Sequence, residues 1–387
     1  MKRLLFFFFI FLTAILHAAP SCTAETRLAV LNMGKADCLL LMTDTESYLI
    51  DTGYEHTSNL LLECLRRYGT DRLNGVFLTH CDKDHYGGLE RLARSDIQVD
   101  AWYAPEIYYN IPKEGHPLLS AAAERSDQVT WLRAGDTAVQ SDEITIRVIG
   151  PLSVNTENEN NNSLVFYAET ADGTFLFTGD MKLEEEAALM SIGAIGPADV
   201  LKVPFHGDNT ASSESFVQRV NPEIALICTS TAEEPDTPAS SVLKRYGRIG
   251  AQVYVTQDTR WGYETILDHG QAAVREIEWE IPEQSRSLQM RIDPKQDLLT
   301  LRNTGDREIS LAGWLLYSTR GEECILLPED ALLPAGGEYS IGTRITTEDA
   351  TLKLDMKRLW HKSKPDQAIL YDTYGSIAAT AGNGIEQ

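Results

Sequence analysis

One short segment constrains this chain more than any other feature. It runs from His80 to Gly88 with the sequence HCDKDHYGG, directly after an apolar, strand-like run at Gly75–Thr79. Four side chains with metal-binding atoms fall within six residues: His80, Asp82, Asp84 and His85. Imidazole and carboxylate ligands together suit zinc, manganese or iron. The glycine pair at its end lets the backbone approach closely before a predicted helix at Leu89–Arg94. The alternative is a polar loop in which acidic residues and histidines occur by chance. The presence of two of the chain's eight histidines in this segment argues against it.

Further ligands of the same kinds stand at the ends of other predicted strands. Asp51 follows one strand, Asp180 another, and His206 a third. Singly, a carboxylate after a strand is more often a helix cap or a turn former. In one α/β domain, together with the His80–Gly88 segment, these residues predict a metal site.

Strands and helices alternate from Arg27 to about Glu280, which indicates an α/β domain with mixed sheets. The predicted strands are Arg27–Met33, Cys38–Thr43, Ser47–Asp51, Gly75–Thr79, Ile144–Val148, Leu164–Ala168, Phe175–Thr178, Val200–Val203, Ile224–Cys228 and Val253–Thr256. The predicted helices are Ser58–Tyr68, Leu89–Arg94, Lys182–Met190 and Glu214–Val220.

The pattern changes after Pro282 to short strand-like runs separated by turn clusters, without a helix of useful length. The runs are Leu288–Ile292, Leu298–Asn303, Ser310–Tyr317, Glu338–Ile341 and Ala368–Tyr371. This pattern predicts a small all-β sandwich. We therefore expect an α/β domain at 25–282 and a second domain at 286–387, joined by a linker at 282–286.

The N-terminus is typical of a secretory signal peptide. Lys2 and Arg3 precede an apolar run at Leu4–Leu16, and small residues allow a cut before Glu25. We expect residues 1–24 to be removed and the mature protein to be secreted, periplasmic or held at the cell surface; an uncleaved anchor is the alternative. The cysteines that remain are odd in number and sparse, which is no disulfide framework.

The chain is strongly acidic, with a formal net charge of -23. A general polyanion-binding protein is usually basic, so the charge argues against that class. It leaves open an enzyme that touches phosphate through metal ions.

Six segments, taken in order, resemble the metallo-β-lactamase-fold hydrolases, and most closely the hydrolase domain of ComEC-type competence proteins. They are the turn at Asn32–Asp37, the Asp-Thr-Gly turn within Leu49–Gly53, the His80–Gly88 segment, the Asn-Ser-Leu-Val stretch within Asn160–Val165, the Thr-Gly-Asp strand end at Phe177–Asp180, and Leu201–Gly207. The resemblance covers about residues 27–280. No stretch resembles the membrane channel of complete ComEC proteins.

The resemblance implies an αββα sandwich with a site for one or two divalent ions, zinc or manganese, at one edge. His80 and Asp82 would bind a first metal, and Asp84, His85 and His206 a second, with Asp180 as the bridge. Asp84 and Asp180 would also be the catalytic carboxylates, and a metal-bound hydroxide would attack phosphorus or a carbonyl carbon.

Other residues of the matched segments are expected to bind substrate or to support the ligands. Asp51 would orient a ligand, and Asn160 or Asn162 would complete the poorer first site or meet substrate. Lys202, Phe205 and Thr237 are likewise expected to bind substrate or to support the ligands. Phe205 and Thr237 stand where the ComEC group carries histidines, which removes a proton donor and adds an aromatic face. His56 is expected in an exposed loop.

The C-terminal part resembles the lamin-tail domain over about residues 286–378. The resemblance rests on Leu299–Gly305, Ile309–Leu316 and the turn at Leu332–Tyr339. It implies an immunoglobulin-like sandwich that serves for attachment. A basic cluster (Lys357, Arg358, His361, Lys362 and Lys364) is either a solvated loop or a contact to DNA or a cell-envelope component.

Together these features predict an exported metal-dependent hydrolase, a phosphodiesterase or nuclease whose substrate is a small phosphodiester or nucleic acid. Two alternatives stay open. One is the hydrolysis of a small ester, lactone or phosphoester. The other is a hydrolase fold that has lost catalysis and binds an envelope component or polymer.

Overall fold

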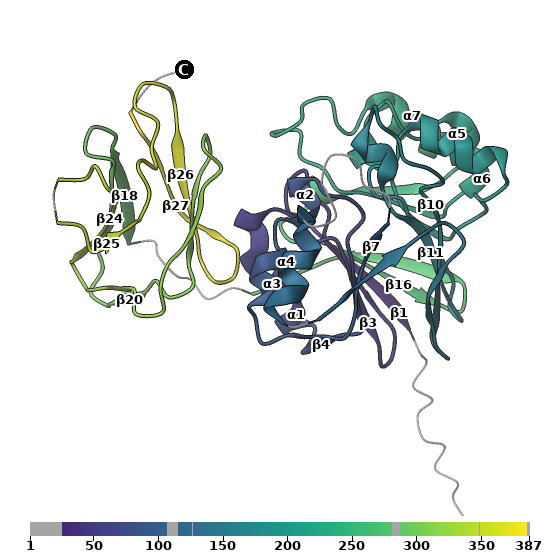
Figure 1. The fold of residues 1–387 in the computed structure, drawn as a ribbon, viewed down its shortest axis with the longest axis horizontal. Helices are drawn as coiled ribbons and strands as arrows, with labels where there is room; N and C mark the ends of the chain where they lie inside the picture. Colours follow the sequence, from purple (N-terminus) through teal and green to yellow (C-terminus); the bar gives the residue numbers. More distant parts are fainter. Residues whose placement is uncertain (1–24, 107–114, 126, 281–286, 348, 385–387) are drawn as a thin grey trace, which may run out of the picture.

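The computed structural model describes residues 25–106, 115–125, 127–280, 287–347 and 349–384. The predicted signal peptide and the predicted linker lie outside the described residues. Figure 1 shows two bodies side by side: an α/β part that holds two stacked sheets, and a smaller part built of strands alone.

The first sheet of the α/β part has eight strands in the order β17-β16-β1-β2-β3-β5-β7-β8. They are β17 (Gln271–Glu276), β16 (Gly262–Asp268), β1 (Thr26–Leu31), β2 (Leu39–Met42), β3 (Ser47–Ile50), β5 (Gly75–Phe77), β7 (Trp102–Pro105) and β8 (Val129–Leu132). The pairs from β17 to β3 are antiparallel, and those from β3 to β8 are parallel. A short ladder of β4 (Arg72–Leu73) and β6 (Gln98–Val99) lies beside it.

The second sheet has seven strands in the order β15-β14-β13-β12-β11-β10-β9. They are β15 (Gln252–Val255), β14 (Ile224–Ile227), β13 (Val200–Lys202), β12 (Thr174–Phe177), β11 (Val165–Thr170), β10 (Ile144–Gly150) and β9 (Thr137–Gln140). The pairs between β12 and β15 are parallel. Parallel neighbours end at one edge of a sheet, so side chains that follow them are brought together.

Helices cover the outer face of each sheet. The first sheet carries α1 (Ser58–Arg67), α2 (Lys83–Tyr86), α3 (Leu89–Ala93) and α4 (Pro117–Glu124), and the second α5 (Leu183–Ser191), α6 (Glu214–Val220) and α7 (Ser240–Arg248). One buried apolar cluster lies between the sheets, where Phe77 stacks on Phe166. Two more clusters lie between each sheet and its helices. This is the predicted αββα sandwich, and the fold class is confirmed.

The C-terminal part is a β-rich region with its own apolar core around Trp314 and Trp360. One sheet has the order β18-β19-β24-β25, a second β22-β21-β26-β27, and β20 pairs with β23. The strands are β18 (Leu288–Asp293), β19 (Leu298–Asn303), β20 (Ile309–Ser310), β21 (Leu315–Ser318), β22 (Cys324–Leu326), β23 (Leu332–Leu333), β24 (Glu338–Gly342), β25 (Leu352–Lys353), β26 (Gln367–Tyr371) and β27 (Ile377–Gly382).

One predicted strand of this region is wrong. The run Ser310–Tyr317 is two strands, because the chain turns between β20 and β21. Gly313 adopts a left-handed conformation (φ 71°) in this turn, which the apolar spacing of the run conceals.

The two parts touch through α1 and the short helix before it, η1 (Glu55–Thr57). The Asn59 amide donates hydrogen bonds of 3.0 and 2.9 Å to the carbonyls of Gly313 and Asp372. The His56 ring stacks on Tyr317 with the ring centroids 4.2 Å apart. The expectation of an exposed loop at His56 is therefore wrong: the histidine is a half-buried contact between the two parts. None of the described helices has the length and apolarity needed to cross a membrane.

Candidate metal centre

The predicted ligands converge on one edge of the α/β sandwich because each follows a strand. Asp51 comes directly after β3, and His80 follows β5. Asp180 follows β12, and His206 follows β13 within a short helical turn, η4 (Pro204–Gly207). Strands of both sheets thus deliver polar side chains to the same place.

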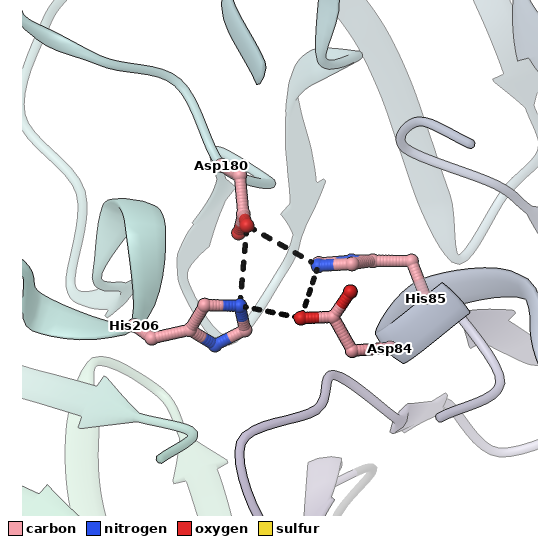
Figure 2. A group of neighbouring side chains, drawn as sticks. All are labelled: Asp84, His85, Asp180 and His206. Atoms are coloured by element: carbon pink, nitrogen blue, oxygen red, sulfur yellow. Dashed lines mark ion pairs between the residues drawn. The ribbon is translucent and has the colours of Figure 1, made fainter. Parts of the chain in front are cut away.

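Four of these side chains form a compact group: Asp84, His85, Asp180 and His206 (Figure 2). One oxygen of Asp180, Oδ2, lies 3.1 Å from His206 Nε2 and 3.4 Å from His85 Nε2. Asp84 Oδ2 lies 3.4 Å from His206 Nε2. All four ligand atoms lie within 4.8 Å of one another. These are the four residues that the resemblance implies for the second metal.

The chemistry of the four side chains fits a divalent cation. The Nε2 atoms of His85 and His206 are buried, and neither has a hydrogen-bond partner among the described residues. Asp180 Oδ1 is buried without a partner as well. Buried polar atoms are normally satisfied, so several orphaned atoms that face one another indicate a missing ligand. Two imidazoles and two carboxylates are a donor set that zinc and manganese accept.

Each histidine is oriented through its other ring nitrogen. Asp51 accepts a hydrogen bond of 2.8 Å from His85 Nδ1 and is itself held by the backbone N–H (2.8 Å) and the hydroxyl (2.7 Å) of Thr79. The carbonyl of Cys228 lies 2.7 Å from His206 Nδ1. Partners on Nδ1 fix the tautomer that leaves Nε2 free as a ligand.

The surrounding carboxylates give the centre a field that favours cations. Burial disfavours the charged form of His85, but Asp180, Asp51 and Asp84 outweigh it and hold its pKa well above its usual range. The same balance, led by Asp180, raises the pKa of His206 to about 9. Burial opposes ionisation of Asp180 too, yet the two imidazoles hold its pKa well below the usual range.

A buried ion pair between Lys202 and Asp37 lies next to the four-residue group. The ammonium of Lys202 contacts the carboxylate of Asp37, donates a 3.0 Å hydrogen bond to the carbonyl of Gly179, and lies 3.6 Å from Asp180 Oδ1. Both charged residues are almost completely buried. Lys202 therefore holds other groups in place, and it has no surface to offer a substrate.

The backbone at the centre adopts conformations that side chains usually avoid. Phe205 (φ 47°) and His206 (φ 52°) are consecutive left-handed residues, and Asp51 (φ 56°) is a third. A bulky residue at positive φ is a genuine outlier, and such strain concentrates at functional sites. Gly87 and Gly88 meet the expectation from the sequence: a Cβ on either would collide with the backbone of residues 52–55.

The first metal position of the resemblance is only partly assembled. His80 Nε2 is buried without a hydrogen-bond partner among the described residues, and it lies 3.8 Å from Asp180 Oδ2. Asp82 Oδ2 lies 3.5 Å from the same nitrogen, but the Asp82 side chain is 48% exposed. The two residues therefore lie beside the four-residue group without joining it.

Three further predicted residues differ in how they are placed. Asn162 has both amide atoms engaged within its own loop, by Asn155 and Glu159. Thr237 is buried, and its hydroxyl contacts Thr229 Oγ1 at 2.6 Å. Neither side chain is free to meet a substrate, so of the two expected roles only a supporting one is open to them. Asn160 is half-buried, and its side chain makes no hydrogen bond within the described residues.

Two lysines at the site escaped the sequence analysis. Lys35 Nζ lies 3.4 Å from Asp84 Oδ2, and Lys182 Nζ lies 4.4 Å from the centroid of the Phe205 ring. Both belong to matched segments or adjoin them, but a lysine in a loop carries no pattern of its own. The one available signal was their nearness in sequence to Asp37 and Asp180.

Comparison with known proteins places the chain. Residues 32–231 match the family model of the metallo-beta-lactamase superfamily, which is more than half of the chain. ComE operon protein 3 of Bacillus subtilis is 27% identical over 260 residues, which cover 62% of this chain and 33% of that protein. Competence protein ComA of Neisseria gonorrhoeae is 25% identical over 236 residues, 60% of this chain and 31% of that protein. The predicted kinship with competence proteins is thus confirmed as distant homology, and the chain spans about a third of each relative's length.

Among solved structures, the diiron β-hydroxylase CmlA of Streptomyces venezuelae matches with a TM-score of 0.45 at 12% identity, over 65% of this chain and 55% of that one. The matched family model includes the loop with Asp84 and His85, the Thr-Gly-Asp strand end and His206. The chain belongs to the metallo-beta-lactamase superfamily and has the fold of its metal-dependent hydrolases.

Proposed function

We propose that this protein is an exported phosphodiesterase that depends on a divalent metal, zinc or manganese, and cleaves nucleic acid or a smaller phosphodiester. The observation that carries the proposal is the group Asp84, His85, Asp180 and His206, with its orphaned imidazole nitrogens directed at one point. A solely structural role gives no reason to bury three imidazole nitrogens that make no hydrogen bond, counting that of His80, around the carboxylate of Asp180.

In this proposal the four residues bind the cation, and His80 with Asp82 supplies a weaker second position. A bound divalent ion lowers the pKa of water and polarises a phosphoryl oxygen. Asp84 and Asp180 each direct an oxygen toward His206 Nε2, where the cation would bind. Each carboxylate could also accept a proton from water there. Asp51 keeps His85 in its ligand tautomer.

Two observations favour a phosphodiester over other substrates. One relative is named a competence protein and another a recombination protein, and these names suggest a link to nucleic acid. Lys35 and Lys182 also place positive charge beside the centre of a protein whose formal net charge is -23. Positive charge beside the centre suits an anionic substrate.

We further propose that residues 1–24 direct export and that the C-terminal sandwich is a lamin-tail domain that attaches the enzyme to an envelope component. Lys357, Lys362 and Lys364 are exposed and available for such a contact. Arg358 is not, because its guanidinium binds the carbonyl of Pro294 at 2.9 Å inside the domain.

The test uses the chain from Glu25 onward, purified without chelator and supplied with zinc or manganese. Bis(4-nitrophenyl) phosphate, single-stranded DNA and double-stranded DNA are offered as substrates, with 4-nitrophenyl acetate as the ester. We expect metal-dependent cleavage of at least one phosphodiester and its loss in His85→Ala. His269→Ala is the matched control, because His269 is an exposed histidine outside the centre. Turnover that survives His85→Ala would refute the site, and cleavage of the ester alone would refute the substrate class.

A further inference from the structure

The rim of the metal centre carries an aromatic ring between two lysines. Lys182 Nζ lies 4.4 Å from the centroid of the Phe205 ring, and Lys35 Nζ lies 5.9 Å from it. The same ring lies 6.3 Å from the ring of His206. Lysines attract the face of an aromatic ring through its quadrupole, so Phe205 gathers both ammonium groups beside a metal ligand.

The two lysines differ in whether a carboxylate forms an ion pair with the ammonium group. Lys35 pairs with Asp84, and its side chain is only 20% exposed. Lys182 is half-buried, and none of the carboxylates in the described ranges pairs with its ammonium group. Among the described residues, no carboxylate thus lies within ion-pair distance of the Lys182 ammonium group, although acidic residues are abundant in the chain.

Contacts with residues from two other loops fix the position of Lys182. Asn161 Oδ1 accepts a 2.9 Å hydrogen bond from the backbone N–H of Lys182, and Asn161 itself is buried. Phe205 is held in a left-handed conformation (φ 47°) that a bulky side chain avoids. Asn161 thus anchors the backbone of Lys182, and the strained backbone of Phe205 holds the ring beside the ammonium group of that lysine.

We propose that Lys182 and Lys35, gathered by the ring of Phe205, form an anion clamp that selects phosphodiesters over neutral esters. The inference rests on the proposed function and deepens it, because it names the residues that recognise the charge of the substrate. Lys182 meets a non-bridging phosphate oxygen, Lys35 balances Asp84 and the substrate together, and Phe205 is a positioning residue.

The first test measures kcat/KM for bis(4-nitrophenyl) phosphate and for 4-nitrophenyl acetate on the metal-loaded full chain. In Lys182→Met the ratio of the phosphodiester value to the ester value should fall about tenfold, as expected for one lost hydrogen bond to a charged group. Lys182→Arg should restore most of the ratio, because it restores the charge. Lys244→Met, at an exposed lysine of α7, is the matched control and should leave both values unchanged.

A second readout keeps this inference separate from the proposed function. Binding of inorganic phosphate to the metal-loaded protein is measured by titration calorimetry in each variant. Weakening of about tenfold in Lys182→Met supports the clamp even if no substrate is turned over. Equal phosphate affinity and an equal ratio in Lys182→Met would overturn the clamp, while metal-dependent cleavage in the same samples would leave the proposed function standing.

Discussion

Removing the buried ammonium of Lys202 should destabilise the α/β part severely. Asp37, its partner, is almost completely buried, and His85 Nδ1 at 3.8 Å and His206 Nδ1 at 3.6 Å are the other cationic groups near that carboxylate. Breaking a buried ion pair on one side usually costs about 3–5 kcal/mol. Because the two imidazoles still offset part of the Asp37 charge, we take about 3 kcal/mol for Lys202→Met.

The matching double variant tests the cause of that loss. In Lys202→Met with Asp37→Asn the unpaired charge of Asp37 is gone, but the carbonyl of Gly179 still loses its donor and Asp180 Oδ1 still loses the ammonium 3.6 Å away. The lost hydrogen bond costs about 1 kcal/mol, so the double variant should be more stable than the single one. A change of 1 kcal/mol shifts the melting temperature of a domain of this size by roughly 2–4 °C, which predicts a drop of about 6–12 °C for Lys202→Met.

Scanning calorimetry in the presence of chelator is the assay, since bound metal would stabilise the variants unequally. Lys244→Met serves as the control. A drop of less than about 2 °C for Lys202→Met, below the shift of a single kcal/mol, would contradict the reasoning. So would a double variant that melts as low as the single one, because the loss would then not come from an unpaired Asp37.

Three further predictions follow from other contacts. Asp51→Asn replaces the charged acceptor of His85 Nδ1 by a neutral amide, so metal affinity should fall about 10–100-fold in competition with a chromophoric chelator; equal affinity would contradict the orienting role. Burial lowers the pKa of His56 to about 4. As pH falls, the state in which the two parts are separated and His56 is exposed therefore binds a proton before the docked state does. The docking of the two parts should therefore weaken by about 1 kcal/mol between pH 6.5 and pH 5, seen as increased domain separation in X-ray scattering, and His56→Phe should abolish the pH effect. Asn59→Ala leaves the carbonyls of Gly313 and Asp372 without a donor, so hydrogen exchange in β21 should quicken about tenfold; unchanged exchange would show that the contact carries no energy.

The sequence sufficed to predict the fold and to bring the main candidate ligands together, because their signals are local. The apolar run of β5, the glycine pair after it and the ligands between them lie in one continuous stretch, and the Thr-Gly-Asp strand end is equally compact. A parallel strand order then brings such strand ends to one edge without further information.

The sequence could not predict the roles of residues whose contacts come from segments far away in the chain. Asn162 and Thr237 lie in matched segments, but their hydrogen bonds turn them into loop supports. Lys182 gains its place from Asn161 and Phe205, which come from two other loops. His56 contacts Tyr317 of the C-terminal part, and no local sequence pattern predicts this contact.

The measurement that tests the central claim most directly is the metal content of the chain from Glu25, purified without chelator. We expect about one tightly held divalent ion per chain, with a second bound more weakly if His80 and Asp82 contribute. Asp180→Ala and His206→Ala should each abolish the tight ion while the protein remains folded, and His269→Ala should retain it. A wild-type protein that holds no metal after dialysis against zinc or manganese, or an Asp180→Ala variant that retains the ion, would contradict the account.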